Sequence, residues 1–366
     1  MKIAMIGQKG IPTLFGGVER HVEEISCRLA RKKDYSVFVY TRGYYTPRDI
    51  KEYRGVNLIH VLSLKTKHLD AISHALFSTF HAMFKLKADV IHFHGVGPAL
   101  CLWIPKLLYP QTKVVFTFHC QDYYHQKWGS FARFSLKLGE IIGCRFADEV
   151  IPVSKELENY VKKSYRRRSK FIPHGINPEE QRSDNLIKQW ELSKNSYVLT
   201  VSRLIPHKGI HYLLKAYSQI KTDKKLVIVG PSFYTKDYEE KLKKMAKADK
   251  RVIFLGSQHG EVLKQLYSNA FVFVNPSEQE GLPLVVLEAA SFGKPLLLSG
   301  IPIHKAVLED LPFFFRNKSP KNLKDNLEAL LNNPQLAYQR ARKIKSYSIK
   351  NYNWDRTVEN ITLKYA

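Results

Sequence analysis

Short apolar runs alternate with segments of helical hydrophobic period along the whole chain. In the first half, runs of strand length lie at Ile3–Ile6, Val37–Tyr40, Val90–Phe93, Val114–Phe118 and Val150–Val153. After a break, the series resumes at Tyr197–Val201, Lys225–Val229, Arg251–Leu255, Phe271–Val274 and Pro295–Leu298. Strands that alternate with helices form a parallel sheet covered on both faces, so the pattern predicts an α/β protein with two doubly wound domains.

The break between the two series marks the domain boundary. Residues 162–194 contain few large apolar side chains and include the turn-forming segment 174–178. We therefore expect an N-terminal domain over residues 1–180, a linker near residues 176–190 and a C-terminal domain over residues 181–366. A closing helix over about residues 352–366 either stays with the second domain or returns to the first.

Composition and charge narrow the class of protein. A chain of 366 residues with 44% hydrophobic residues can bury large cores, which excludes a disordered segment. The 58 basic residues exceed the 33 acidic ones, giving a net charge of +25, which favours an anionic partner: nucleic acid, an anionic membrane surface or a phosphorylated substrate. The four cysteines are widely spaced and indicate neither a zinc site nor a disulfide framework. We expect a cytoplasmic protein whose membrane contact is at most peripheral.

The first candidate for chemistry is a pair of glutamates around a turn. Glu280 and Glu288 flank a Gly-Leu-Pro segment after a predicted strand, and proline favours the first turn of a helix. The N–H groups and positive dipole end of a helix beginning near Pro283 suit a diphosphate. The alternative is two surface glutamates near an ordinary helix start.

The second candidate is a pair of cations on one loop. Arg203 and Lys208 follow the strand Tyr197–Val201, and ligands bind at the carboxyl ends of strands in open α/β sheets. An arginine fork and a lysine charge together can balance a nucleotide diphosphate. In so basic a chain, the alternative is a solvated surface pair.

The third candidate is the turn after the first strand. Gly16 and Gly17 permit a ligand to approach the backbone at the start of a helix. The spacing is not that of the dinucleotide-binding fingerprint, and no acidic residue ends the second strand, which disfavours a hydride-transfer enzyme.

Together these motifs resemble family 4 glycosyltransferases, which are retaining enzymes of the GT-B superfamily, and the resemblance covers nearly the whole chain. In chain order, the matching residues are Gly16 and Gly17, His119, Arg203 and Lys208, and Glu280 and Glu288. The stretch over residues 114–177 is also similar to bacterial glycosyl- and rhamnosyltransferases that build capsule or the O-antigen of lipopolysaccharide. The resemblance implies two Rossmann-like domains facing across a cleft. It also implies transfer of a sugar from a nucleotide-diphosphate sugar to a saccharide or lipid-linked saccharide.

The resemblance also implies roles for individual residues. The donor-binding residues would be Gly16, Gly17, Arg203, Lys208, Gly281, Leu282, Pro283, Leu284 and Glu288. The catalytic residues would be His119, Arg203, Lys208 and Glu280, and Asp122 would orient His119 or contact the acceptor. Arg203 and Lys208 would stabilise the leaving diphosphate in place of a metal, so that neither a metal nor another cofactor is expected.

A further segment bears on the membrane. Leu69 to Phe84 has apolar residues at 69, 72, 76, 80 and 83, with Lys65, Lys67, Lys85 and Lys87 at its ends. It is either an amphipathic helix that touches the anionic inner face of the cytoplasmic membrane or a helix packed on the sheet of the first domain.

Two other functions compete with sugar transfer. One is a basic nucleic-acid-binding protein, against which stand the dispersed cations and the lack of a reading motif, so no nucleic-acid partner is expected. The other is a non-catalytic GT-B-like scaffold, against which stand the intact Arg203, Lys208, Glu280 and Glu288.

Overall fold

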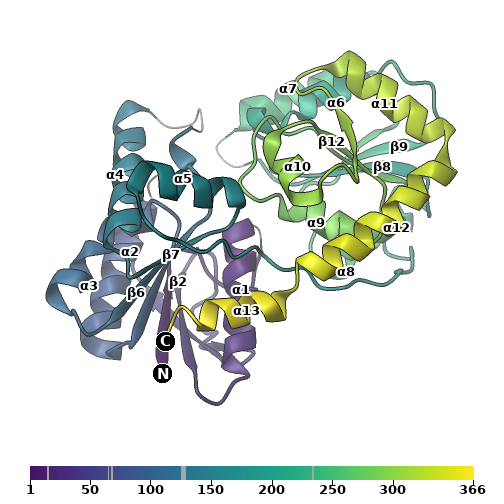
Figure 1. The fold of residues 1–366 in the computed structure, drawn as a ribbon. Helices are drawn as coiled ribbons and strands as arrows, with labels where there is room; N and C mark the ends of the chain where they lie inside the picture. The colour runs from purple at the N-terminus through teal and green to yellow at the C-terminus, as the bar shows by residue number, and fades with distance from the viewer. Residues whose placement is uncertain (15, 65, 67–68, 125–128, 233–234) are drawn as a thin grey trace. The chain divides into compact units, whose positions relative to one another are not determined.

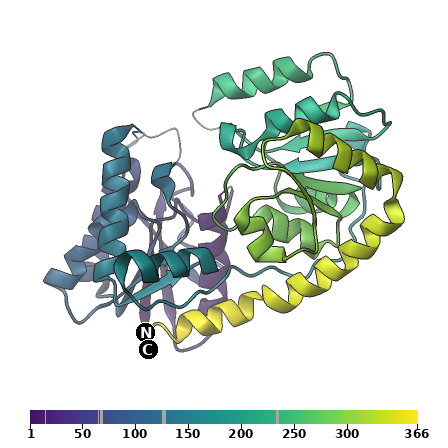
Figure 2. The same ribbon diagram turned by 45° about the horizontal axis from the view of Figure 1, so that its top comes forward.

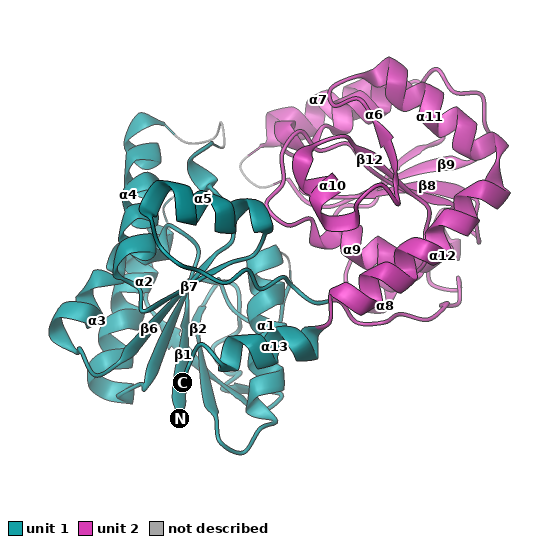
Figure 3. Ribbon diagram, in the orientation of Figure 1, with its two compact units in different colours: residues 1–175, 354–366 teal, residues 176–353 magenta. Residues whose placement is uncertain are grey.

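The structure is a computed structural model that describes every residue except 15, 65, 67–68, 125–128 and 233–234. The chain forms two compact units (Figure 3), the first made of residues 1–175 and 354–366 and the second of residues 176–353. The first unit thus ends five residues before the expected boundary at 180 and includes residues 354–366.

The segment expected to be a linker, residues 176–190, is part of the second unit. Ile187 is fully buried there, and the Leu186 amide donates to the Gln265 side chain at 2.9 Å. The structure thus assigns the expected linker to the second unit, because hydrogen bonds hold this segment to that unit.

A seven-stranded sheet forms the centre of the first unit. Its order is β3-β4-β2-β1-β5-β6-β7, and every neighbouring pair is parallel except β3 with β4. The strands are β1 Lys2–Ile6, β2 Ser36–Arg42, β3 Glu52–Tyr53, β4 Val56–Val61, β5 Val90–His94, β6 Lys113–Phe118 and β7 Glu149–Pro152. The order places β1 beside β5, at the point where the chain changes from building one side of the sheet to building the other.

Helices cover both faces of this sheet (Figure 1). The helices are α1 Gly17–Ala30, α2 Asp70–Phe80, α3 Trp103–Leu108, α4 Ser130–Phe146, α5 Lys155–Tyr165 and α13 Trp354–Thr362, with a π-helical turn over His81–Leu86. On one face, α1 and α13 share a core with alternate residues of the strands, among them Ile3, Met5 and Val37. On the other face α4 lies against the sheet, because Gly143 leaves room for the Phe116 ring.

The second unit repeats this arrangement with six strands. The order β10-β9-β8-β11-β12-β13 is parallel throughout, with β8 Tyr197–Val201, β9 Lys225–Val229, β10 Val252–Phe254, β11 Val272–Asn275, β12 Leu296–Ser299 and β13 Phe313–Phe315. Helices lie on both faces of this sheet as well (Figure 2). The helices are α6 Ile210–Tyr217, α7 Lys236–Ala246, α8 Gly260–Asn269, α9 Leu284–Ser291, α10 Pro302–Leu308, α11 Pro320–Asn332 and α12 Pro334–Asn351. Successive residues of β8 enter different cores: Tyr197 and Leu199 pack with α8, α9, α10 and α12, and Val198 packs with α6, α7 and α11.

The segment Leu69–Phe84 folds as α2 followed by the π-helical turn. His74, Ala75, Ser78, Thr79, Ala82 and Met83 are buried, whereas Leu69, Phe77, Phe80 and Phe84 are exposed. The buried face therefore does not follow the predicted stripe, and Lys65 and Lys67 lie outside the described residues. No helix in the described part of the chain is long and apolar enough to cross a bilayer.

Gly175 allows α13 to dock on the first unit. A Cβ atom at Gly175 would lie 2.3 Å from the backbone nitrogen of Trp354, the first residue of α13. The close approach of α13 therefore requires a glycine at this position.

Gly175→Ala should destabilise the first unit by about 1–3 kcal/mol through overpacking. The measurement is the midpoint of urea unfolding followed by circular dichroism, which should be lower than in the wild type. Gly97→Ala is the matched control, because its Cβ would make an ordinary 3.7 Å contact with Leu136. Equal midpoints for the two variants would contradict the assigned docking.

Candidate active site

Two loops of the second unit meet at the switch point of its sheet. β8 and β11 are neighbours, yet the chain leaves β8 toward β9 and leaves β11 toward β12. The loops that follow β8 and β11 therefore diverge from the same place at the carboxyl edge, which is where open α/β sheets bind ligands. The first loop carries Arg203 and Lys208, and the second carries Glu280.

Lys208 and Glu280 form an ion pair between these loops. The Lys208 Nζ donates to Glu280 Oε1 at 2.6 Å, and the Ser277 hydroxyl donates to the same oxygen at 2.7 Å. Burial alone would raise the pKa of the Glu280 carboxyl, but the Lys208 charge and the two hydrogen bonds outweigh it and hold the pKa at about 2. Because that pKa is depressed, the pair stabilises the fold above the ordinary carboxyl pKa, and this contribution is lost as the pH falls toward about 2.

Gly209 brings the two loops close enough for this pair. Its φ is +68°, and a Cβ atom would lie 2.0 Å from the carbonyl oxygen of Pro276. The backbone also links the loops, since the Glu278 amide donates to the His207 carbonyl at 2.8 Å. The position of Lys208 therefore depends on a glycine at the next residue.

Arg203 lies on the same loop in a different environment. Its side chain is exposed, and within the described residues it forms no hydrogen bond or ion pair. An exposed guanidinium with five N–H donors can bind an anion without breaking an existing contact.

The turn before α9 supplies fewer backbone donors than expected. Residues 281–284 are expected to bind the donor, but Pro283 has no N–H, and the Leu284 amide donates to the Leu282 carbonyl at 3.0 Å. The donors that remain in this turn are the N–H groups of Gly281 and Leu282. Further along α9, Glu288 accepts a hydrogen bond from the Tyr267 hydroxyl at 3.1 Å.

In the first unit, Gly16 and Gly17 begin α1 as expected. Gly16 has a φ of +107°, and a Cβ atom there would lie 1.9 Å from the Glu19 carboxylate. That carboxylate accepts from the Lys9 amide at 3.2 Å, and Glu23 accepts from the Thr13 amide at 2.7 Å. The first turns of α1 thus hold the preceding loop by its backbone.

His119 directly follows β6, at the carboxyl edge of the first sheet. Its ring is buried, and its Nε2 lies 3.3 Å from Nδ1 of His94, the last residue of β5. Burial lowers the pKa of His119 to about 4, against a smaller raising effect of the Asp122 charge. Asp122 itself accepts a hydrogen bond from the Cys120 thiol at 3.2 Å.

Sequence reasoning missed several residues that shape these sites. Ser277 positions Glu280, and Tyr267 positions Glu288. Gly209 positions Lys208. Of these three residues, only Gly209 carried a local signal in the sequence, because glycine often ends a turn. His94 was missed because nothing in its own stretch of sequence points to His119.

Two family models match the chain. The model described as "Glycosyltransferase Family 4" matches residues 15–180, and the model described as "Glycosyl transferases group 1" matches residues 182–351. The chain belongs to the family 4 glycosyltransferases. The sheets of its two units are the two Rossmann-like sheets of the GT-B fold, which confirms the predicted fold class.

Known glycosyltransferases resemble this one over much or most of its length. An uncharacterized glycosyltransferase of Methanocaldococcus jannaschii is 29% identical over 331 residues, covering 82% of this chain and 81% of the relative. The UDP-Gal:alpha-D-GlcNAc-diphosphoundecaprenol alpha-1,3-galactosyltransferase of Escherichia coli is 29% identical over 241 residues, covering 62% of each chain. Among solved structures, Anabaena HepE in complex with UDP-glucose has a TM-score of 0.82 and 19% identity, covering 99% of this chain and 98% of HepE.

Gly209→Ala tests how the glycosyltransferase positions Lys208. The added methyl group collides with the Pro276 carbonyl, so the Lys208 loop must move away from Glu280, and sugar transfer should fall by at least about tenfold, the effect of losing about 1.4 kcal/mol. The assay is turnover with the preferred nucleotide sugar.

Gly256→Ala is the matched control for this variant. Gly256 has a similar φ of +62°, but nothing lies within 4 Å of its Cβ position. It imposes the same backbone strain without the collision and should keep most of the activity. An equal loss of activity in the two variants would show that backbone strain, and not the approach of the two loops, lowers turnover, and full activity in Gly209→Ala would contradict the assigned role of Gly209.

Proposed function

We propose that this glycosyltransferase moves a sugar, with retention at the anomeric carbon, from a nucleoside-diphosphate sugar to a saccharide or lipid-linked saccharide of a cell-surface polysaccharide. The observation that carries the proposal is the Lys208–Glu280 pair at the switch point of the second sheet, with the exposed Arg203 on the same loop as Lys208. The E. coli relative, named for a lipid-linked acceptor, and the UDP-glucose complex of HepE support the substrate classes.

The donor diphosphate binds to the two cations. Arg203 offers a bidentate fork, and Lys208 adds a second positive charge that Glu280 holds in place. The N–H groups of Gly281 and Leu282 add neutral donors next to the start of α9.

Carboxylates and the first unit bind the rest of the donor. Glu288 accepts from the ribose hydroxyls, because a carboxylate can accept from two donors at once. Glu280 contacts the sugar through Oε2, since its Oε1 is taken up by Lys208 and Ser277. Gly16 and Gly17 let the backbone approach the phosphate, His119 contacts the sugar, and Asp122 contacts the acceptor or orients His119.

The reaction needs charge stabilisation on the leaving group. The bond between the anomeric carbon and the diphosphate oxygen breaks, and the acceptor hydroxyl oxygen bonds to that carbon on the same face. The hydroxyl proton passes to the departing diphosphate oxygen. Arg203 and Lys208 neutralise the charge that develops there, so the transfer runs without a metal.

Arg203→Ala is the sharpest test of the donor site. The side chain is exposed and unpaired within the described residues, so its loss should leave the fold intact while nucleoside diphosphate binding weakens by about 10- to 100-fold. The measurement is a thermal-shift and calorimetric panel of UDP, GDP, dTDP and ADP with their sugar conjugates. Lys221→Ala, an exposed cation just before β9 at the opposite edge of the sheet, should bind like the wild type.

Lys208→Ala and added chelator complete this test. Lys208→Ala should abolish turnover, with a loss of stability as well, since it leaves the Glu280 carboxylate buried without its cation. Chelator should leave turnover unchanged.

Full activity of Arg203→Ala would overturn the donor site, and complete loss of activity with chelator would overturn the metal-free mechanism. Salt-sensitive binding to RNA or DNA with no response to any nucleotide would favour the nucleic-acid-binding alternative.

We further propose that the first unit binds the anionic cytoplasmic face of the membrane through an aromatic surface made of Phe77, Phe80, Phe84, Trp103 and Leu107. All five side chains are exposed, with Phe84 at 56% and Leu107 at 67%. Phe80 stacks on Phe84, and the ring of Tyr109, which follows α3, lies 6.5 Å from that of Phe84 between centroids. These ring contacts link the end of α2 and its π-helical turn to the residue after α3.

The charge beside this surface favours an anionic bilayer over a protein partner. Lys85 and Lys87 are exposed next to Phe84, and each cation near an anionic surface adds about 1 kcal/mol of binding. An interfacial aromatic residue next to lysines is typical of peripheral membrane helices.

The double variant Phe77→Ser/Phe84→Ser should weaken binding to phosphatidylglycerol vesicles by at least about tenfold, since each phenylalanine contributes about 1.5–3 kcal/mol when buried. Co-sedimentation at fixed salt measures it, with uncharged phosphatidylcholine vesicles as the reference. Leu336→Ser, which removes an exposed leucine of α12, should bind like the wild type. Equal binding of the double variant and the wild type would exclude this surface.

A further inference from the structure

Five histidines from distant parts of the sequence gather inside the first unit. His21 lies on α1, His92 and His94 on β5, His119 just after β6, and His174 near the end of the first long segment of the unit. The ring centroids of His21 and His119 are 4.9 Å apart, and those of His21 and His174 are 4.2 Å apart. The cluster sits at the switch point of the sheet, because β1, which leads into α1, pairs with β5.

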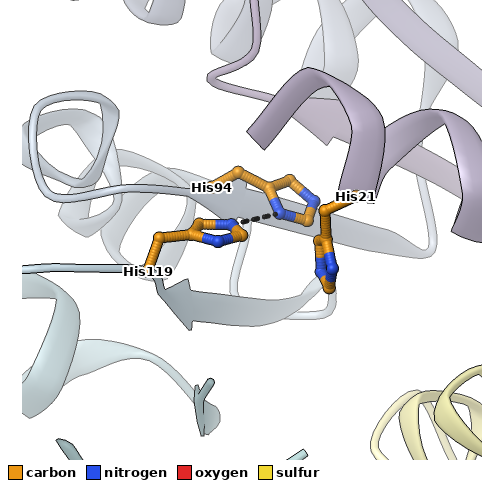
Figure 4. Close-up of side chains that lie close together, drawn as sticks. All are labelled: His21, His94 and His119. Carbon is orange, nitrogen blue, oxygen red and sulfur yellow. Dashed lines mark hydrogen bonds between the residues drawn. The ribbon is translucent and has the colours of Figure 1, made fainter. Parts of the chain in front are cut away.

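Three of these rings turn nitrogen atoms toward one another. Figure 4 shows His21, His94 and His119 with their rings grouped around a common point. One ring nitrogen from each lies within 4.8 Å of the other two, and the Nδ1 of His94 is 3.3 Å from Nε2 of His119. Zn–N bonds of about 2.0–2.1 Å at a tetrahedral angle place ligand nitrogens about 3.4 Å apart, so the rings need to shift by at most about 1.4 Å to share one ion.

The hydrogen bonding of these rings is incomplete. Both nitrogens of His21 and the Nε2 of His94 are buried with no hydrogen-bond partner among the described residues. His92 differs, because its two nitrogens bond to the hydroxyls of Tyr365 and Thr117 at 2.7 Å. Both nitrogens of His92 are therefore engaged, whereas His21 and His94 have nitrogens without a partner, which a metal ion could supply.

These imidazoles are also in the protonation state that binds metals. Burial and, for His21 and His94, the neighbouring histidines lower the pKa values of all three rings, that of His119 to about 4. Neutral rings keep a lone pair for coordination at neutral pH, and no proton has to be displaced.

We propose that His21, His94 and His119 form a binding site for one transition-metal ion of the zinc class in the first unit. The ligands are all imidazole nitrogens, which suit Zn²⁺, Co²⁺, Ni²⁺ or Cu²⁺, and no carboxylate is in the set to favour Mg²⁺ or Ca²⁺. Three protein ligands would leave a fourth tetrahedral position open for water or another ligand. The His174 ring lies next to His21, with ring centroids 4.2 Å apart.

The metal site shares His119 with the donor site proposed above but supplies no step of the transfer. A metal ion would occupy the His119 ring that we expect to contact the donor sugar, so metal and donor would compete for one side chain. Chelator should therefore not lower sugar transfer, and failure of the metal site would leave the donor site of the second unit standing.

Cobalt titration of the chelator-treated, untagged protein tests the site. Tetrahedral Co²⁺ gives strong visible absorption, and we expect one Co²⁺ per chain, displaced by one equivalent of Zn²⁺ but not by Mg²⁺. His21→Ala and His94→Ala should each weaken binding by at least about tenfold, the effect of losing one ligand or its close support.

His74→Ala is the matched control. His74 is a fully buried histidine of the same unit, and its ring nitrogens also have no hydrogen-bond partner among the described residues. Burial lowers the pKa of His74 to about 3. It lies on α2, outside the cluster. Its loss disturbs a core of the same kind without removing a ligand, so it should bind Co²⁺ like the wild type.

The wild-type protein alone can also decide the proposal, should the variants not fold. X-ray absorption of the Zn²⁺-loaded chain should show three imidazole ligands. Fewer than three imidazoles, or no tetrahedral cobalt band in the wild type, would overturn the site. Unchanged cobalt affinity in folded His21→Ala and His94→Ala would do the same, because the ion would then be held by other histidines.

Discussion

Both units depend on one constraint, which is the order of strands in their sheets. Apart from β3, the strands pair in parallel, and at one point the chain stops adding strands to one side of the sheet and begins adding them to the other. All strands of a parallel sheet end at one edge, and at the reversal two neighbouring strands send their loops in opposite directions. In the second unit this occurs between β8 and β11, whose loops carry Lys208 and Glu280, and in the first unit between β1 and β5. Each unit therefore gathers its polar chemistry at one point of an otherwise apolar framework.

Most strands of this framework can be predicted from the local sequence. Strands such as Tyr197–Val201 and Lys225–Val229 were predicted to the residue, because an apolar run of this length is too short for a typical buried helix and is typical of a buried strand. Three strands were missed: β3 and β4 lie at an edge with mixed polarity, and β13 has only three residues. Such short or half-exposed strands owe their form to the neighbour they pair with, which local sequence does not reveal.

The candidate site was only partly predictable for a related reason. Arg203, Lys208 and Glu280 could be selected by residue type and order, but their pairing depends on Gly209 meeting the Pro276 carbonyl across 67 positions of sequence. The cluster of His21, His94 and His119 was even harder to predict from the sequence. Only His119 stood out in the sequence, and its approach to His21 and His94 follows from strand order, which no local pattern encodes.

The return of α13 to the first unit makes the second unit an insertion into the first. Residues 176–353 are continuous, so the second unit can fold as soon as they have left the ribosome. The first unit is begun earlier but completed later, since Trp354, Val358 and Ile361 fill its core. During synthesis, the face of the first sheet that α13 shares with α1 therefore stays partly uncovered until residues 354–361 have been made.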